Sequence, residues 1–119
     1  MSTDGRPSIE TLAKRLAEFA REREWEPFHS PKNLAMALAG EAGELIEHFQ
    51  WLTEPQSRNL SDERREAVAL EMADVLLYLV RLADQLHIDL LDAADRKIAL
   101  NARKYPVARF RGSARKYDE

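Results

Sequence analysis

The sequence has 119 residues, of which 45% are hydrophobic and 33% charged, and its formal net charge is -3. This composition predicts one small folded domain and excludes collagen-like, low-complexity and largely disordered chains. Apolar runs are short, as at Val75–Val80, and the N-terminus lacks the apolar segment that directs secretion. The absence of Cys excludes thiolate metal sites and suits a reducing compartment. We therefore expect a soluble cytoplasmic protein with no membrane partner.

Charge is unevenly distributed along the chain. Residues 95–117 contain 8 basic residues and 1 acidic residue, whereas residues 1–94 contain 10 basic and 18 acidic residues. The overall acidity predicts that nucleic acid is not a partner. The separation would allow one part to hold a cation and another to hold a polyanion. Alternatively, the basic stretch only solvates a C-terminal helix and tail.

The first half of the chain predicts two helices. Ser8 is the expected N-cap of the first, which ends near Trp25. Its apolar residues recur at the helical spacing of three or four, at Ile9, Leu12, Leu16 and Phe19. The pair Ser30-Pro31 begins the second helix, which runs to about Trp51. Its apolar stripe consists of Leu34, Leu38, Leu45 and Phe49.

The second half predicts two more helices after a loop over residues 52–60. Ser61 caps a third helix that reaches about Leu86, and a fourth begins near Asp89 and stops before Pro106. Val107 to Glu119 is expected to be extended or mobile. No segment predicts a strand. We therefore expect an all-α fold in a single domain over residues 1–119, with a helical body over about 8–105 and a basic tail over 106–119.

The third helix is apolar on all its faces between Val75 and Val80. Such a segment is expected to be buried on all sides. A lone domain of this size has difficulty covering it completely, so neighbouring subunits are expected to contribute. The sequence therefore predicts a homo-oligomer.

Two pairs of acidic residues are spaced so that each pair shares a helix face. Glu41 and Glu44 lie on the second helix, and Glu71 and Asp74 repeat the spacing on the third. No cation lies close on either face, the nearest after the second pair being Arg81 about two turns on. If the two helices pack antiparallel, four carboxylates converge without a protein cation. An all-oxygen set of this kind suits Mg²⁺, with Mn²⁺ as a substitute.

These acids allow two other interpretations. They could be solvated surface residues that share a common spacing by coincidence, because a single E-x-x-E is a weak motif. A di-iron carboxylate site is disfavoured, because such bundles use E-x-x-H and neither His48 nor His87 follows a Glu at that spacing.

Further motifs surround the acids in a fixed order over roughly residues 9–117. They are Trp25-Glu26-Pro27-Phe28-His29, Asn33-Leu34, Gly40-Glu41-Ala42-Gly43-Glu44-Leu45, Phe49-Gln50-Trp51, Asp74-Val75-Leu76-x-Tyr78-Leu79, Arg103-Lys104-Tyr105-Pro106 and Arg111-Gly112-Ser113-x-Arg115-Lys116-Tyr117. Together with the acids, this pattern resembles the MazG-like all-α nucleoside triphosphate pyrophosphohydrolases, and within them the dCTP pyrophosphatase branch.

The resemblance implies a four-helix MazG-like bundle, usually a homotetramer, that uses magnesium to hydrolyse a deoxynucleoside triphosphate, with dCTP or modified dCTP favoured, to monophosphate and pyrophosphate. Carried over by position, the metal ligands are Glu41, Glu44, Glu71 and Asp74. Glu41 would orient or deprotonate the attacking water, and Glu71 is the second catalytic candidate. The residues implied to border the substrate are Trp25, Phe28, His29, Trp51 and Tyr78.

Basic and amide side chains offer donors for a triphosphate. Lys97, Asn101 and Lys104 fall on one face of the fourth helix, and Arg111 and Lys116 follow in the tail. We expect Lys97, Lys104, Arg111 and Lys116 to stabilise charge on the leaving group, with Asn101 beside them.

One position departs from the resemblance. The vertebrate enzymes have a His near the substrate where this chain has Leu16, so other deoxynucleotides or modified cytosines stay open as substrates. Two other functions also stay open: a non-catalytic helical oligomerisation module, and a nucleotide-binding regulator.

Overall fold

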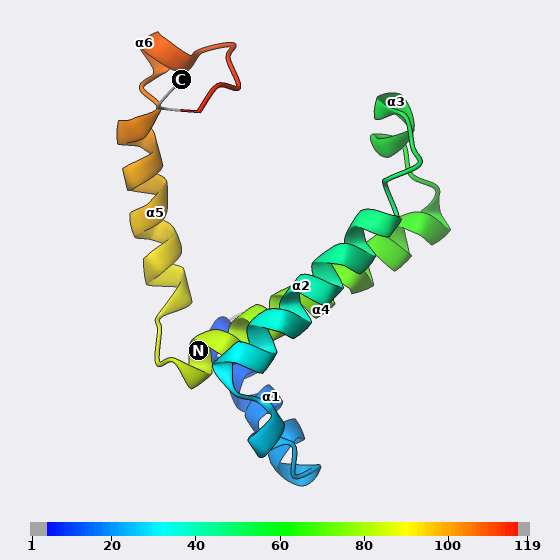
Figure 1. Cartoon of the computed structure of the whole chain (residues 1–119), viewed down its shortest axis with the longest axis vertical. Coiled ribbons are helices and arrows are strands. Elements are labelled where there is room, and N and C mark those ends of the chain that lie inside the picture. Colours follow the sequence, from blue (N-terminus) through cyan, green and yellow to red (C-terminus); the bar gives the residue numbers. More distant parts are fainter. Residues whose placement is uncertain (1–4, 117–119) are drawn as a thin grey trace. The chain divides into compact units, whose positions relative to one another are not determined.

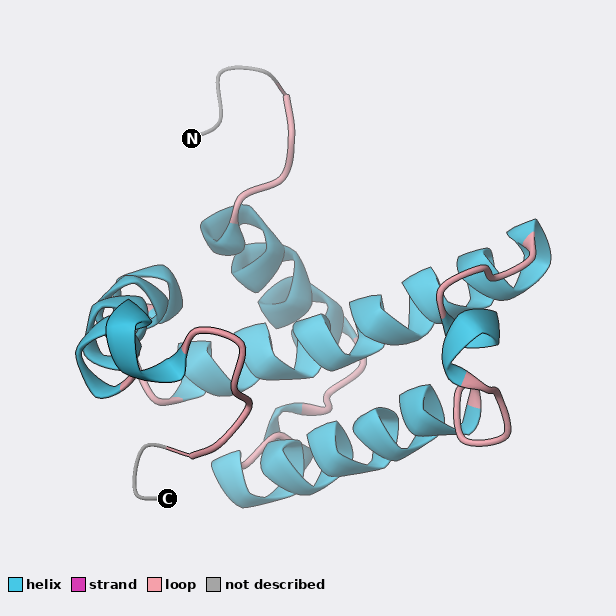
Figure 2. Cartoon of the chain, turned by 90° about the horizontal axis from the view of Figure 1, so that it is seen from above, coloured by secondary structure: helices cyan, strands magenta, loops and turns pink. Residues whose placement is uncertain are grey.

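The structure, a computed structural model, describes residues 5–116, and every regular element among them is a helix. In chain order these are α1 (Ile9–Glu22), the 3-10 turn η1 (Glu26–Phe28), α2 (Pro31–Glu47), α3 (Glu54–Ser57), α4 (Asp62–Gln85), α5 (Leu90–Lys104) and α6 (Val107–Phe110) (Figure 1). Residues 5–116 contain no strand (Figure 2), and none of their helices is long and apolar enough to cross a membrane. The predicted all-α fold class is confirmed.

The chain divides into two compact units after His87, and each is described by itself. The first contains α1 to α4, and the second contains α5 and α6. The expectation of one MazG-like domain over residues 1–119 stays a prediction.

The helix starts follow the predicted caps. Each predicted cap side chain accepts a hydrogen bond from the backbone N–H three residues further on, at 3.0–3.2 Å, and the four are Ser8, Ser30, Ser61 and Asp89. These bonds satisfy donors that the first helical turn leaves without a partner. Local side-chain chemistry therefore defines where the four long helices begin.

The short helices differ from the prediction. α2 ends at Glu47 rather than near Trp51, and α3 forms within the expected loop, where Thr53 caps it. Within the tail expected to be extended, Val107–Phe110 instead forms α6, whose Phe110 is buried and meets the Tyr105 ring edge-on at 4.9 Å between ring centroids. Helices of four residues are too short to show a hydrophobic period. Tyr117 and the rest of residues 117–119 lie outside the described residues.

The core of the first unit is built on an antiparallel pair of helices. α2 and α4 run side by side in opposite directions, and α1 packs against α4 (Figures 1 and 2). The buried apolar side chains of this unit come from these three helices, and they are Ala20, Leu34, Val68, Val80 and Ala83. The antiparallel arrangement places the acidic pair of α2 opposite that of α4.

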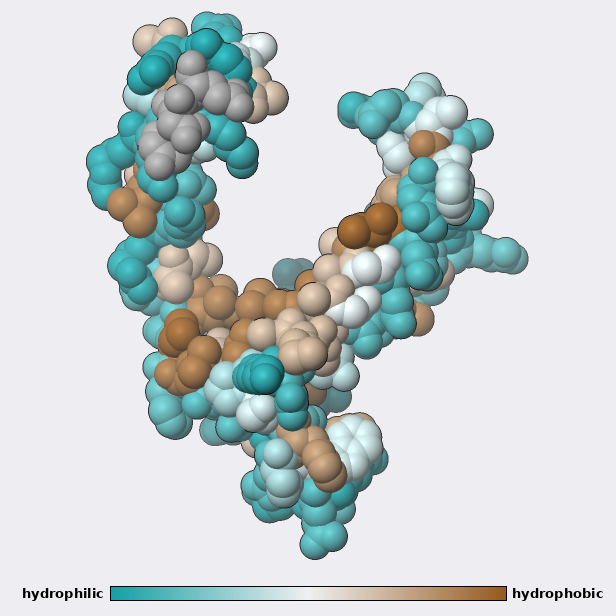
Figure 3. Space-filling model, viewed as in Figure 1, coloured by the Kyte–Doolittle hydropathy of each residue, from teal (hydrophilic) through white to brown (hydrophobic). Residues whose placement is uncertain are grey.

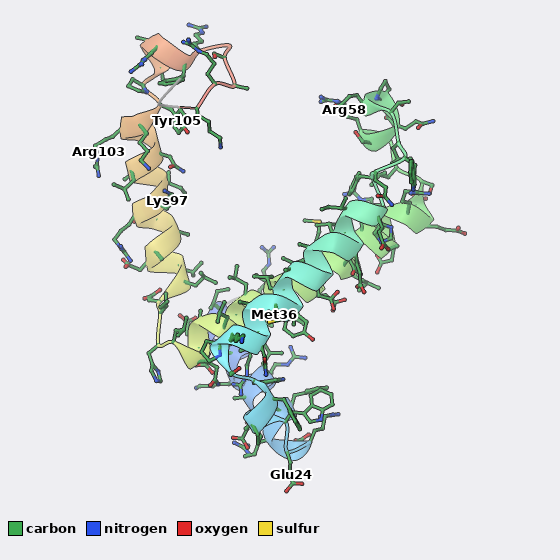
Figure 4. The ribbon with its side chains drawn as sticks, viewed as in Figure 1. Glu24, Met36, Arg58, Lys97, Arg103 and Tyr105 are labelled. Atoms are coloured by element: carbon green, nitrogen blue, oxygen red, sulfur yellow. The ribbon has the colours of Figure 1, made fainter. Side chains whose placement is uncertain are left out.

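Much apolar surface of α2 and α4 is left uncovered within one chain. Within one chain the run Val75–Val80 is buried only in part, because Val80 is buried but Leu76 is 40% exposed. Figure 3 shows apolar side chains gathered along these two helices, and Figure 4 places Met36, which is 63% exposed, on α2. One chain of this length supplies only part of the cover that such a run requires. The cover expected from neighbouring subunits stays a prediction.

Candidate active site

Three of the four predicted metal ligands converge between α2 and α4. Glu41 and Glu44 lie one turn apart on α2, and Glu71 faces them from α4. One carboxylate oxygen from each residue lies within 4.8 Å of the others. We call Glu41, Glu44 and Glu71 the acidic cluster. It joins residues about thirty positions apart in the sequence because the two helices are antiparallel.

Two oxygens of the acidic cluster are buried without a hydrogen-bond partner among residues 5–116. They are Oε2 of Glu41 and Oε1 of Glu71. A buried carboxylate oxygen without a donor is costly to the folded state. A hard divalent cation coordinated by both oxygens would satisfy them, and carboxylate oxygen is the ligand that Mg²⁺ prefers. The residues present therefore fit a magnesium ion.

The proximity of the three carboxyl groups perturbs their acidity. A hydrogen bond to Glu44, burial, and the neighbouring negative charges raise the pKa of Glu71 to about 7. The pKa of Glu41 is raised as well, first by its hydrogen bond with Glu44. Hydrogen bonds from Glu71 and Glu41 lower the pKa of Glu44. Without a bound cation, the acidic cluster therefore retains a proton up to near-neutral pH.

Asp74, the fourth predicted ligand, lies beside this cluster rather than within it. Its charge helps to raise the pKa of Glu41, so the two carboxyl groups are close. Asp74 also lines a neighbouring pocket. Asp74 is therefore an acid of the pocket wall that lies near the cluster.

The pocket has a volume of about 570 Å³ and lies between α1, the segment before α2, and α4. Trp25, His29 and Tyr78, three of the predicted substrate residues, line it. Leu16 lines it too, so the position at which the sequence departs from the expected pattern belongs to the pocket wall. The remaining wall is mostly apolar, with Leu12, Phe19 and Leu77.

Aromatic rings meet edge-on along one side of the pocket. The Phe19 and Trp25 ring centroids are 5.7 Å apart, and those of Trp25 and His29 are 6.3 Å apart. Edge-on packing fixes the ring planes. A mostly apolar pocket with few polar groups suits the flat ring of a ligand. A cation held by the neighbouring acids would suit anionic groups at the other end of that ligand.

The chain is similar to several known proteins. A model of the MazG-like family matches residues 37–119. The chain belongs to the MazG-like family. It is 48% identical over 115 residues to dCTP pyrophosphatase 1 of Mus musculus and to that of Homo sapiens, covering 95% of this chain and 68% of each relative. A crystal structure of a pyrophosphatase from Archaeoglobus fulgidus is also similar, with a TM-score of 0.78 and 39% identity over 85% of this chain and 94% of that one.

The MazG-like membership confirms the family predicted from the sequence. The matched segment, residues 37–119, contains all four acids but not Trp25 or His29. α1 and Trp25, which form one wall of the pocket, lie within the part of the chain that aligns with the mammalian relatives. That alignment extends over 95% of the chain.

Two residues that the MazG-like resemblance implies at the substrate lie outside the pocket. Phe28 is 67% exposed and Trp51 is 86% exposed, and neither lines it. Trp51 is the last residue of the turn that follows α2, in which the sequence expected the helix to continue. Within one chain, the structure therefore brings neither of them to the acidic cluster or the pocket.

The predicted phosphate-binding residues all belong to the second unit. Lys97, Asn101 and Lys104 lie on α5, which is continuous over all three, so they share a helix face as predicted. Arg111 follows α6, and Lys116 is the last described residue. Their contact with substrate stays a prediction.

Sequence reasoning missed two arginines of the pocket wall, Arg15 and Arg81. Arg81 is buried and contacts His29. A signal for it was present, because Arg81 follows Asp74 by seven residues and Tyr78 by three and so shares their face of α4. Arg15 directly precedes Leu16, and no comparable signal marked it.

Proposed function

We propose that this chain cleaves a deoxynucleoside triphosphate, with dCTP or a modified dCTP favoured, to the monophosphate and pyrophosphate with the aid of Mg²⁺. The observation that carries the proposal is the acidic cluster with its two buried oxygens lacking hydrogen-bond partners, next to an aromatic pocket. The chain is a hydrolase of the pyrophosphatase type, as are the relatives to which it is 46–48% identical. Their printed name, dCTP pyrophosphatase 1, supports the choice of dCTP.

The acids would bind the metal at the phosphate end of the nucleotide, and the pocket would bind the base at its other end. Glu41, Glu44 and Glu71, joined by Asp74, would hold the magnesium. When bound, Mg²⁺ would neutralise phosphate oxygens and make a coordinated water more acidic. Trp25 and Tyr78 would hold the base in the pocket. This arrangement would place the α-phosphorus near Asp74, the acid of the pocket wall beside the cluster.

Glu41 would orient the attacking water and accept its proton. The water oxygen would form a bond to the α-phosphorus while the bond from that phosphorus to the bridging oxygen breaks. The products are then the monophosphate and pyrophosphate. Lys97, Lys104, Arg111 and Lys116 would stabilise the charge that develops on the departing pyrophosphate, with Asn101 as a further donor.

Turnover by two matched glutamine variants tests the proposal. Glu41→Gln removes a carboxylate of the cluster, whereas Glu47→Gln alters an exposed glutamate on the same helix. With Mg²⁺ and dCTP, we expect the wild type and Glu47→Gln to release pyrophosphate, and Glu41→Gln to be slower by about a hundredfold or more. An equally active Glu41→Gln would contradict the role of the cluster. A folded wild-type chain that binds dCTP but releases nothing would favour a nucleotide-binding regulator.

We also propose that the protein is a homo-oligomer, with a tetramer as the specific expectation. The exposed apolar side chains of α2 and α4, including Met36, Leu70 and Met72, support this. Light scattering on the eluting peak of a size-exclusion column measures the mass directly. A monomer at micromolar concentration would contradict the proposal, and a dimer would contradict the tetramer.

A cytoplasmic location and the absence of a nucleic-acid partner, both expected from the sequence, stay predictions. Cell fractionation with an antibody to the chain tests the first. Retention of the protein on a polynucleotide column at low salt would contradict the second.

A further inference from the structure

A buried arginine forms part of the pocket wall. Arg81 follows the apolar run of α4, and only 5% of its surface is exposed. Arginine keeps its positive charge throughout the physiological pH range, so a buried guanidinium requires acceptors around it. The residues that supply these acceptors indicate what Arg81 does.

Three side chains accept hydrogen bonds from Arg81. Nε donates to Nδ1 of His29 at 3.2 Å, and Nη1 donates to Oδ2 of Asp84 at 3.5 Å. With the amide oxygen of Gln85 turned toward the guanidinium, Nη1 and Nη2 both donate to it at 3.1 Å. Asp84 and Gln85 lie one turn further along α4, whereas His29 comes from the segment before α2. The acceptors on α4 thus hold the guanidinium so that its Nε meets His29.

This contact determines which nitrogen of His29 carries the proton. The Nε of arginine always bears a hydrogen, so Nδ1 of His29 can only accept. A neutral imidazole must then carry its proton on Nε2. Burial, and then the charge of Arg81, lower the pKa of His29, which favours the neutral ring. Among residues 5–116, Arg81 is the one hydrogen-bond partner of the His29 side chain.

His29 lines the side of the site that suits a base. It belongs to the pocket wall, and its ring lies edge-on to Trp25. The apolar and aromatic side chains there fit a flat ring better than they fit a triphosphate. The anionic groups instead need the cation that the acidic cluster would hold. A donor on His29 is therefore available to the base rather than to the phosphates.

We propose that Arg81 is a positioning residue that holds His29 as the Nε2–H tautomer, so that His29 donates a hydrogen bond to an acceptor on the base. The identity of this ligand rests on the proposed function, whereas the tautomer does not. Cytosine carries two acceptors, O2 and N3, on its pairing edge. With Arg81 in place, His29 presents a hydrogen to them. Without it, the ring is free to present a bare nitrogen, which repels them.

Nitrogen NMR of the imidazoles of the full chain tests the tautomer without any nucleotide. We expect His29 of the wild type to show a protonated Nε2 and a bare Nδ1. Arg81→Met removes the donors but keeps an unbranched side chain, and we expect it to give a mixture of tautomers. The matched control is Arg64→Met on the same helix, since Arg64 donates to the backbone oxygen of His48 at 2.8 Å and does not contact His29. This control should leave the His29 signals unchanged.

An Nδ1–H tautomer in the wild type would overturn the proposal, and this result needs no variant to fold. An unchanged Nε2–H tautomer in a folded Arg81→Met would overturn it as well.

Kinetics separate this role from a purely structural one. We expect Arg81→Met to raise the KM for dCTP about five- to tenfold, the effect of losing one hydrogen bond, with a smaller change in kcat. Arg81→Lys, which restores a donor, should recover part of that loss. In a His29→Phe background, Arg81→Met should change KM no further, because Arg81 acts through His29.

Two further outcomes are distinguishable. Multiplying losses in the double variant would show that Arg81 acts independently of His29, and would overturn the proposal. A wild type that turns over no nucleoside triphosphate would contradict the proposed function, while the NMR result would still decide whether Arg81 fixes the tautomer of His29.

Discussion

Glu41 on α2 and Glu71 on α4 each bury one carboxylate oxygen, and neither oxygen has a hydrogen-bond partner among residues 5–116. The two residues face each other because the helices are antiparallel, and Glu44 completes the cluster within 4.8 Å. Negative charges this close destabilise the metal-free fold. The acidic cluster therefore lowers the free energy of unfolding of the metal-free protein, and a bound cation would restore it.

Glu71→Gln should stabilise the metal-free protein and abolish its response to Mg²⁺. The amide removes one negative charge and offers an N–H donor to the neighbouring carboxylates. We expect a higher melting temperature than the wild type in the presence of a chelator, no further rise on adding Mg²⁺, and turnover lower by about a hundredfold or more. Thermal unfolding with and without Mg²⁺ measures the first two effects.

Glu47→Gln provides the control for this experiment, because it changes the same kind of side chain at an exposed position of α2. It should respond to Mg²⁺ as the wild type does. A Glu71→Gln protein that Mg²⁺ still stabilises to the wild-type extent would show that the ion does not use Glu71.

The stabilisation by Mg²⁺ should grow with pH. The pKa of Glu71 is raised to about 7 from 4.5, so the metal-free folded state holds a proton that the unfolded chain loses at lower pH. This group therefore lowers the stability of the metal-free protein as pH rises from about 4.5 to about 7. The raised pKa of Glu41 acts in the same direction, and the lowered pKa of Glu44 acts below 4.5.

Because Mg²⁺ must displace that proton, we expect a larger rise in melting temperature from Mg²⁺ at about pH 8 than at about pH 5.5. Thermal unfolding across this range measures it, with Glu71→Gln as the reference. An equal Mg²⁺ effect at both ends of the range would contradict the raised pKa of Glu71.

Leu16→His should change the base preference. Leu16 lines the pocket on α1 and has no hydrogen-bonding group, whereas an imidazole there could donate to or accept from a base. We expect the ratio of kcat/KM for dCTP to that for dTTP to change by about tenfold. Competition between the two nucleotides in one reaction gives this ratio directly. Leu12→His, one turn earlier in the same wall, is the control, and it tests whether a histidine anywhere in this wall has the same effect. An unchanged ratio in Leu16→His would show that the base does not contact this position.

Lys97→Ala should weaken catalysis through the phosphates. Losing a charge that stabilises the departing pyrophosphate is expected to lower kcat/KM for dCTP by about tenfold or more. Arg96→Ala is the matched control, because Arg96 is the adjacent basic residue of α5 and pairs with Asp92 at 2.9 Å. An equal fall in kcat/KM in both variants would indicate a general effect of charge. An unchanged kcat/KM in Lys97→Ala would exclude Lys97 from the site.

The acidic cluster could be predicted because its information is local. Glu41 and Glu44 share a helix face by spacing alone, and so do Glu71 and Asp74. The caps at Ser30 and Ser61 then define the helices that carry the two pairs. Which of the four acids come together depends on packing, which the spacing does not show. Three of them converge, and Asp74 lines the pocket instead.

The role of Arg81 could not be predicted in this way. Its partner His29 lies 52 residues earlier in the chain, and only the packing of α4 against the segment before α2 brings them together. The cover of Val75–Val80 could not be assigned for a related reason, because the sequence shows that a face is apolar but not which chain covers it. The helix formed by Val107–Phe110 depends on packing of Phe110 against Tyr105, which no periodicity signals.

Hydrolysis of dCTP in water enriched in oxygen-18 tests the proposed reaction most directly. If water attacks the α-phosphorus at the acidic cluster, mass spectrometry should find the heavy oxygen in dCMP and none in pyrophosphate, with the reaction dependent on Mg²⁺ and lost in Glu41→Gln. Heavy oxygen in pyrophosphate, or products that are dCDP and phosphate, would contradict attack at the α-phosphorus and with it the proposed function.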